Sequence, residues 1–326
     1  MVLAVGMRRV LVLGGTAWLG GEIAREALRD GAEVVCLARG ESGTAPNGVR
    51  FVQADRSVPG AYDHVDDDWD EVIELAYDPA VVGSALDALA DRARHWTLVS
   101  TVSVYDRNDE PGSDESAGLV TPKDLTEYAD AKVAAERTTA ARLADRLLVV
   151  RPGLIMGPGD PSDRFGYWPA RLHRGGRVLA PTTAGRFVQA IDVADLAAWI
   201  VKAGREGITG TMNAVGEPHP FDTFLAQAGL VAGFGGTFVT VDDEWLLEHD
   251  VRYWAGPRSL PLWLPASDAA FAQRSNAAFV ASGGFIRPLQ ASIARILEDE
   301  VDRGLDRSRR AGLTSAEETN LLDAAR

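Results

Sequence analysis

Cysteine is almost absent from this chain of 326 residues, and its five histidines are scattered. The single cysteine, Cys36, excludes an internal disulfide framework, and a protein without disulfides is compatible with the reducing cytoplasm, where we expect it. No HExxH motif and no paired spacing of cysteine and histidine is present, so the sequence predicts no metal site. A GxSxG motif is also missing, which argues against a serine hydrolase of that type.

Positive charge and long apolar runs are scarce as well. The chain has 33 Lys and Arg against 47 Asp and Glu, and the net charge of −14 argues against a nucleic-acid partner. The run Arg303–Arg310 is locally basic, but acidic residues interrupt it, and we expect a solvated helix face there. No apolar run is long enough to cross a membrane, and the first nine residues do not have the pattern of a signal peptide. The remaining expectation is a small-molecule partner.

A glycine-rich turn lies close to the start of the chain. Val10–Leu13 is a short apolar run that favours a β-strand, and residues 14–21 follow it with the sequence GGTAWLGG. Apolar residues then recur at helical spacing from Ile23 to Leu28. A strand, a glycine-rich turn and a helix in this order are typical of a dinucleotide-phosphate site, where the helix N-terminus faces the pyrophosphate. Without a ligand the same pattern would be a tight turn, but we favour cofactor binding.

A YxxxK pair, Tyr128 and Lys132, lies in a stretch from Leu125 to Leu143 without proline or glycine. Four residues of helix place both side chains on one face, roughly 6 Å apart along the axis. A phenol is a poor base at neutral pH, and a nearby ammonium lowers its pKa and makes it a usable acid or base. An isolated YxxxK also fits an exposed tyrosine beside a solvated lysine, so the surrounding motifs decide its meaning.

Strand-like and helical patterns alternate up to Val150, which predicts an α/β fold with a doubly wound parallel sheet. The expected strands are Val10–Leu13, Val34–Leu37, Arg50–Gln53, Glu71–Leu75, Trp96–Ser100 and Leu147–Val150. We expect a Rossmann-type core in residues 1–158, to which residues 186–215 return through the strand Phe187–Ile191. Residues 159–185 and 216–326 should form a smaller substrate lobe.

Together these motifs resemble the extended short-chain dehydrogenase/reductase superfamily, in its epimerase/dehydratase-like branch. The resemblance runs through about the first 215 residues, with the segments in the family's order. It implies that Thr101, Tyr128 and Lys132 are catalytic: Tyr128 exchanges a proton with the substrate oxygen, Thr101 orients that oxygen, and Lys132 binds the cofactor ribose and lowers the pKa of Tyr128. The cofactor-binding residues that it implies are Gly14, Thr16, Ala17, Trp18, Leu19, Gly20, Arg39, Asp55, Arg56, Ala76, Lys132, Pro152 and Gly153.

The end of the second strand bears on the choice of cofactor. Folds that prefer NAD usually place an acid there to hold the ribose 2′-hydroxyl. Here Ala38 occupies that position and Arg39 follows, whose guanidinium would suit a 2′-phosphate. Arg39 could also be an ordinary loop residue. We expect NADP as the preferred cofactor and NAD as the alternative.

Departures from the family pattern bear on the reaction. Dehydratases of this branch carry an Asp-Glu pair after the catalytic threonine, where this chain has Val102 and Ser103. The positions that usually bind a nucleotide-sugar diphosphate are Leu154 and Val188; Arg164 or Arg186 could replace them, although neither falls on the family's position. The residues that we expect to contact substrate are Val102, Ser103, Met156, Arg164, Phe165 and Trp168, with Tyr167 beside them.

These observations predict an NADP(H)-dependent oxidoreductase of the carbonyl reductase or alcohol dehydrogenase type, acting on a small carbonyl or alcohol through a Thr-Tyr-Lys triad. The alternatives are an NAD(P)-dependent epimerase of a sugar or sugar-like substrate and a non-catalytic nucleotide-binding relative. The resemblance also allows a homodimer.

Overall fold

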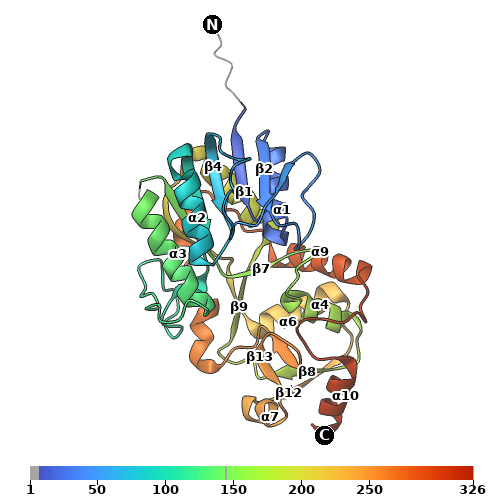
Figure 1. Cartoon of the computed structure of the whole chain (residues 1–326). Coiled ribbons are helices and arrows are strands. Elements are labelled where there is room, and N and C mark those ends of the chain that lie inside the picture. The colour runs from blue at the N-terminus through green and yellow to red at the C-terminus, as the bar shows by residue number, and fades with distance from the viewer. Residues whose placement is uncertain (1–6, 144, 326) are drawn as a thin grey trace.

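The computed structural model describes residues 7–143 and 145–325. Its centre is a sheet of seven strands in the order β10-β6-β5-β4-β1-β2-β3, and every neighbouring pair is parallel (Figure 1). The strands are β1 (Arg9–Leu13), β2 (Glu33–Ala38), β3 (Arg50–Gln53), β4 (Trp69–Glu74), β5 (Ala93–Val99), β6 (Leu147–Pro152) and β10 (Gly210–Ala214). The prediction of a doubly wound parallel sheet is therefore confirmed. Residues 1–6 of the N-terminal segment, for which no signal peptide is predicted, lie outside the described part.

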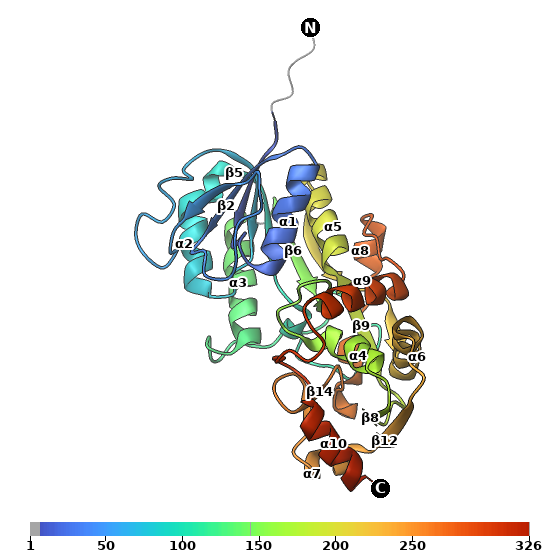
Figure 2. The same cartoon turned by 90° about the vertical axis from the view of Figure 1, so that its right-hand side faces the viewer.

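Helices cover both faces of this sheet because successive strand residues point to opposite sides. Leu11 and Leu13 pack in the apolar cluster that includes α2 (Pro79–Leu89) and α3 (Tyr128–Leu143). On the other face Val10 and Val12 pack in the cluster that includes α1 (Trp18–Arg29) and α5 (Val193–Glu206). Figure 2 shows α1 and α5 side by side on that face.

The topology places a crevice at the carboxyl end of β1. This strand lies between β2 and β4, so the chain winds outward in both directions from it. Ligands of open α/β sheets bind where the strand order reverses in this way, outside the carboxyl ends of the strands. The glycine-rich turn follows β1, and α3 with the YxxxK pair begins near the same edge.

The rest of the chain forms three small sheets and a helical region. The three-stranded sheet has β9 (Phe187–Asp192) between β7 (Leu154–Met156) and β11 (Pro218–Pro220). The two-stranded sheets pair β8 (Arg177–Pro181) with β12 (Thr237–Val241), and β13 (Arg252–Trp254) with β14 (Ser259–Pro261). The helices are α4 (Arg164–His173), α6 (Phe221–Ala232), α7 (Asp243–Glu248), α8 (Ala277–Ala281), α9 (Leu289–Asp302) and α10 (Ser315–Ala324), and the 3-10 segments of the chain are η1 (Ala90–Arg92), η2 (Val102–Val104) and η3 (Ala266–Ala272).

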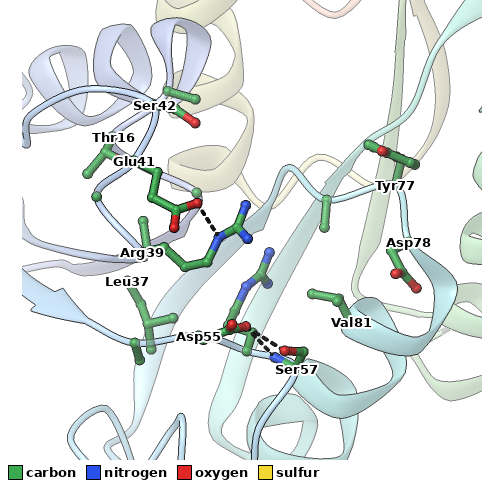
Figure 3. Close-up of a pocket in the computed structure, with 17 residues that line it drawn as sticks. Thr16, Leu37, Arg39, Glu41, Ser42, Asp55, Ser57, Tyr77, Asp78 and Val81 are labelled. Carbon is green, nitrogen blue, oxygen red and sulfur yellow. Dashed lines mark hydrogen bonds and ion pairs between the residues drawn. The ribbon is translucent and has the colours of Figure 1, made fainter.

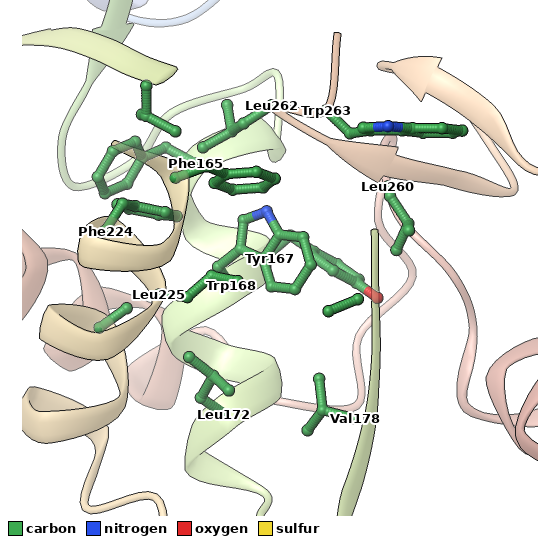
Figure 4. Packing of buried hydrophobic residues seen from close by; sticks show 14 of the residues in the cluster. Phe165, Tyr167, Trp168, Leu172, Val178, Phe224, Leu225, Leu260, Leu262 and Trp263 are labelled. Carbon is green, nitrogen blue, oxygen red and sulfur yellow. The ribbon is translucent and has the colours of Figure 1, made fainter. Parts of the chain in front are cut away.

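Three residues expected to contact substrate belong instead to the core of this second region. Phe165 and Trp168 are completely buried (Figure 4). Met156 is 3% exposed and belongs to the same apolar cluster. The Phe165 ring packs edge-on against Phe224, and the Trp168 indole donates a hydrogen bond to the carbonyl of Pro261 at 2.7 Å. Side chains enclosed in this way leave no surface for a substrate, so the prediction for these three is wrong. Tyr167 lies in the same cluster.

Two further expectations are corrected. The strand predicted at Phe187–Ile191 does not enter the central sheet, because β9 pairs with β7 and β11; the chain returns to the core through α5 and β10. The basic run is not a solvated helix face, because α9 ends at Asp302 and the arginines that follow bind buried carboxylates. Arg307 and Arg309 both pair with Glu300.

Candidate active site

Two adjoining cavities of about 390 and 460 Å³ lie at the carboxyl edge of the central sheet, and Ala17 of the glycine-rich turn lines both. The predicted cofactor residues divide between them. Gly14, Thr16, Ala17, Arg39, Asp55, Arg56 and Ala76 line the first, and Ala17, Trp18, Leu19, Gly20, Lys132, Pro152 and Gly153 line the second. The structure thus brings together residues that are up to 139 positions apart in the sequence, from Gly14 to Gly153.

The glycine-rich turn suits a dinucleotide because it combines close backbone packing with an open helix end. Gly14 has φ of +100°, which favours glycine, and a Cβ on Gly20 would collide with the Gly14 carbonyl oxygen. Ala17 caps α1 without a side-chain hydrogen bond, so the first N–H groups of the helix have no side-chain acceptor at the cap. Free N–H groups and the helix dipole favour a phosphate at this position.

The outer end of the first cavity holds Arg39, which the sequence predicts as the partner of a 2′-phosphate. Its exposed guanidinium pairs with Glu41, with Nε and Oε2 3.3 Å apart (Figure 3). The prediction from Ala38 did not include this acid, which lies three residues later in the sequence. A 2′-phosphate would therefore compete with Glu41 for Arg39.

The two residues after β3 have different surroundings. The Asp55 carboxylate accepts hydrogen bonds from the Ser57 hydroxyl at 2.7 Å and the Ser57 N–H at 2.9 Å, and these lower the pKa of Asp55 (Figure 3). The Arg56 guanidinium donates two hydrogen bonds to Glu74, at 2.6 and 3.0 Å. Because Glu74 is buried and neutralises Arg56, Arg56 adds little net positive charge to the cavity, although it lines it.

The catalytic residues that the resemblance implies meet in the second cavity. Thr101 follows β5 and Tyr128 begins α3, and both line this cavity. The Thr101 hydroxyl accepts a hydrogen bond from the Ser103 N–H at 3.1 Å and lies 3.2 Å from the Ser103 hydroxyl. One turn later Lys132 is buried, and its ammonium donates to the carbonyls of Val99 at 2.6 Å and Ala76 at 3.0 Å. The Lys132 ammonium lies 6.0 Å from the centroid of the Tyr128 ring. The YxxxK spacing therefore places both side chains at one cavity.

Burial and nearby charge act in opposite directions on these groups. Burial around the hydroxyl raises the pKa of Tyr128, whereas the Thr101 hydrogen bond and the positive charge of Arg164 act to lower it. Burial lowers the pKa of Lys132 to about 8. The role predicted for Lys132, to lower the pKa of Tyr128, stays a prediction; Arg164, which the sequence did not connect with Tyr128, adds positive charge that also favours the phenolate.

Of the predicted substrate residues, Val102, Ser103 and Arg164 line the second cavity. Three other residues of this cavity, Asp160, Ser162 and Phe271, are not predicted from the sequence, and Trp254 is one of several tryptophans that the sequence allows in a substrate pocket or in the core. The Gly/Pro/Asp-rich loop before α4 was a signal for the first two. The sequence gives no comparable signal for Trp254 and Phe271, because a tryptophan or a phenylalanine is as well suited to an apolar core as to the wall of a cavity. Trp199 and Trp263, by contrast, are buried in apolar cores.

The cavity also contains a buried hydroxyl without a partner. The Ser100 Oγ is shielded and makes no hydrogen bond to any residue that the structure describes. An unpaired buried polar group costs free energy, so a ligand that bonds to Ser100 would be favoured there. Together with the open end of α1, this supports a polar ligand bound across both cavities.

The structure also bears on metal binding and on membrane insertion. No group of three or more His, Cys, Asp or Glu residues suited to a metal ion occurs in residues 7–143 and 145–325. Among the described helices, none is long and apolar enough to span a membrane.

Solved structures share this fold over most of their length. UDP-glucuronic acid 4-epimerase from Bacillus cereus in complex with NAD has a TM-score of 0.67 and 13% identity, covering 90% of this chain and 99% of that one. The UDP-glucose 4-epimerase of Thermus thermophilus in complex with NAD has a TM-score of 0.66 and 19% identity, covering 91% of this chain and 99% of that one. The dTDP-glucose 4,6-dehydratase from Bacillus anthracis str. Ames in complex with NAD has a TM-score of 0.68 and 14% identity, covering 90% of this chain and 97% of that one.

At these identities the likeness concerns the fold alone, and no curated protein matches the sequence significantly. A family assignment comes from the sequence itself. The model of the NAD dependent epimerase/dehydratase family matches residues 10–216, which include the glycine-rich turn, the Thr-Tyr-Lys residues and β10. The chain therefore belongs to the NAD-dependent epimerase/dehydratase family, within the extended short-chain dehydrogenase/reductase superfamily.

Proposed function

We propose that this chain is an NAD(P)-dependent enzyme of the epimerase type, which inverts a secondary alcohol carbon of a small molecule. The observation that carries the proposal is the meeting of Thr101, Tyr128 and Lys132 in a cavity that joins the glycine-rich turn. When bound, the nicotinamide cofactor supplies reversible hydride transfer. The sequence favoured a carbonyl reductase, but the family match and the epimerase structures of the same fold support the epimerase alternative better.

The chain's own residues would divide the work by position. The Tyr128 phenolate takes the proton of the substrate alcohol, the Tyr128 hydroxyl that this forms returns it, and the Thr101 hydroxyl orients the same oxygen. Lys132 is fixed by Val99 and Ala76, which leaves the remaining N–H of its ammonium for a ribose hydroxyl. These groups act through position and preorganised charge, without covalent attachment.

The cavity composition bears on dehydration. Val102 and Ser103 occupy the positions of the Asp-Glu pair, and Asp160 is the sole carboxylate lining the second cavity among the described residues. Asp160 is buried and accepts hydrogen bonds from Ser162, and burial raises its pKa. Elimination of water needs an acid and a base beside the reacting carbons, so the proposed reaction is inversion rather than dehydration.

The test is a screen of secondary alcohols and sugar-like compounds with the purified protein and added NAD or NADP. Proton NMR follows the appearance of an epimer, and nicotinamide absorbance follows net oxidation or reduction. We expect an epimer to form without a net change in nicotinamide absorbance. In Tyr128→Phe the rate of epimer formation should fall by at least about 100-fold, because proton transfer contributes about that factor. Failure of the wild-type protein to bind either dinucleotide would refute the proposal.

The second candidate is an NADP-dependent reductase, which the guanidinium of Arg39 in the first cavity favours. The same screen separates the two functions. Stoichiometric consumption of NADPH with a carbonyl compound, and no epimer, would identify the reductase.

A further inference from the structure

One arginine of the second cavity has a charge that no acid neutralises directly. Arg164 is the first residue of α4, and it forms no salt bridge with a carboxylate in the described part of the chain. Asp160, which lines the same cavity, favours its charge only from a distance, and burial raises the pKa of Asp160. Its Nε donates to the Ser162 hydroxyl at 3.1 Å, and the two terminal nitrogens have no hydrogen-bond partner among the described residues. Partial burial lowers the pKa of Arg164. A guanidinium that has lost part of its hydration and retains free donors favours an anion.

The loop that carries Arg164 is held from several sides. The Trp18 indole donates to the Pro158 carbonyl at 2.8 Å, and the Gly159 N–H donates to Asp299 at 2.9 Å. Asp163, with φ of +57°, accepts a hydrogen bond from the Arg310 N–H at 2.9 Å and pairs with Arg307. These contacts fix the loop before any ligand binds. A ligand that contacts Arg164 therefore loses little binding free energy to the ordering of this loop.

An aromatic surface lies beside the guanidinium. The central carbon of Arg164 is 5.2 Å from the Trp254 ring centroid, and the Phe271 ring packs edge-on against Trp254 with centroids 5.5 Å apart. Trp254 has φ of +66°, which is unfavourable for a residue of this size, and its N–H bonds to the Trp263 carbonyl at 3.0 Å. Strained backbone of this kind is retained where the surroundings determine it, and it is frequent at ligand sites.

Two other cations that could bind an anion are already engaged. Lys132 donates to two carbonyls. Arg186, the other arginine that could replace a diphosphate contact, is buried and pairs with Asp243. A nucleotide diphosphate carries at least two negative charges, whereas this part of the cavity offers one free guanidinium. One planar guanidinium matches one carboxylate or one phosphate.

We propose that the substrate is a small organic anion: Arg164 binds its carboxylate, and an apolar part of it contacts Trp254 and Phe271. The reacting alcohol carbon would lie between this anion and Tyr128. The inference rests on the proposed function, since it names the substrate class of that same site. It excludes a neutral sugar and does not require a nucleotide.

Three probes of similar shape test it in the presence of saturating NAD or NADP. Mandelate has a hydroxyl, an aromatic ring and a carboxylate; mandelamide replaces the carboxylate with a neutral amide; phenyl phosphate tests the phosphate alternative. Calorimetry gives the Kd of each. We expect mandelate to bind about tenfold more tightly than mandelamide, which corresponds to one charge-assisted contact. Tighter binding of phenyl phosphate than mandelate would identify a phosphate as the anion and overturn the carboxylate assignment.

Two variants distinguish a direct contact of Arg164 with the anion from an effect of the protein's net charge. Arg164→Gln should abolish the preference for mandelate, and Arg252→Gln, the same charge change at an exposed residue of the second region, should retain it. Tyr128→Phe should retain the preference although it loses catalysis. Equal binding of mandelate and mandelamide, binding of neither, or a preference that survives in Arg164→Gln would overturn the inference.

The titration also keeps the two proposals apart. Each variant is first titrated with NAD and NADP, which checks that it is folded. If neither dinucleotide binds to the wild-type protein, the proposed function fails. If a dinucleotide binds and the charge preference is missing, the substrate class alone fails.

Discussion

Lys132 is buried at the wall of the second cavity, with 3% of the residue exposed. Two backbone carbonyls accept its hydrogen bonds, and Glu74 and Glu136 favour its charged form, yet burial dominates and lowers its pKa to about 8. The folded protein therefore releases this proton at a lower pH than the unfolded chain does. The consequence is a measurable link between pH and stability.

Below about pH 8 both states bind the proton, and the folded state retains the full cost of burying the charge. Between about pH 8 and 10.5 the unfolded chain binds more protons, so Lys132 makes the free energy of unfolding rise with pH by about 2 kcal/mol. We expect Lys132→Met to be more favourable relative to wild type at about pH 7 than at about pH 10, by that amount. Urea denaturation of both proteins at the two pH values measures it, and a constant difference would contradict the assignment.

Glu41 provides a second test at the residue scale. It is exposed and lies beside Arg39, so a cofactor 2′-phosphate would be repelled by its carboxylate. We expect Glu41→Gln to tighten NADP binding relative to NAD by about threefold, with a smaller gain at high salt because exposed charges are screened. Calorimetric titrations with both dinucleotides measure the ratio.

Glu22→Gln, which removes an acid that pairs with Arg25 on α1, is the matched control and should leave that ratio unchanged. The gain should disappear in the Arg39→Gln, Glu41→Gln double variant. If it persists there, Arg39 does not contact the 2′-phosphate.

At the scale of elements, the spacing of apolar residues predicted those strands and helices that depend mainly on residues close in the sequence. The apolar run before the glycine-rich turn is β1, and the stretch around the YxxxK pair is α3. Periodicity did not predict partners: Phe187–Ile191 has the same apolar pattern whether it joins the central sheet or, as observed, β7 and β11. For the same reason the sequence predicts that Phe165 and Trp168 are shielded from solvent, but it does not distinguish a place in the core from a place in the wall of a cavity.

The loop between β7 and α4 shows how an element depends on distant contacts. Its Pro158 carbonyl accepts a hydrogen bond from the Trp18 indole, 140 residues earlier. Trp18→Phe removes this bond and keeps an aromatic ring beside Gly159. We expect faster hydrogen exchange in residues 157–164 and a loss of about 1 kcal/mol in the free energy of unfolding, as for one hydrogen bond.

Trp245→Phe is the control, because the Trp245 indole nitrogen makes no hydrogen bond to a described residue. Its exchange in residues 157–164 should match that of the wild-type protein. Unchanged exchange in Trp18→Phe would show that the other anchors of the loop suffice.

At the scale of the whole molecule, the segment after α9 connects the end of the chain to the active-site loop. Arg307 pairs with Asp163, which precedes Arg164, and with Glu300 of α9 at 3.0 Å. The sequence predicted a solvated basic face because its pattern identifies neither carboxylate, one of which lies 144 residues away. Paired arginines and free arginines look the same in a sequence, and only the fold distinguishes Arg307 from Arg164.

Removing Arg307 should therefore affect both stability and the site. Burial alone would raise the pKa of Asp163, but its bonds to Arg307 and to the Arg310 N–H lower it, so this carboxylate stabilises the fold at neutral pH and loses that contribution on acidification. Arg307→Gln leaves Asp163 and Glu300 with fewer donors, and we expect a loss of about 2 kcal/mol at neutral pH. The loss should shrink when the pH falls below the ordinary range of an aspartate.

Arg310→Gln gives the matched comparison, because Arg310 is exposed and contacts Asp163 through its backbone N–H rather than its side chain. Its free energy of unfolding should change by less than about 0.5 kcal/mol, as for an ordinary surface substitution. If Arg307→Gln also weakens mandelate binding while NAD binding is retained, the end of the chain determines how Arg164 is presented. Equal stability of the two variants across the pH range would instead mean that the Asp163 pair contributes nothing, and that the loop is held by Trp18 and Asp299.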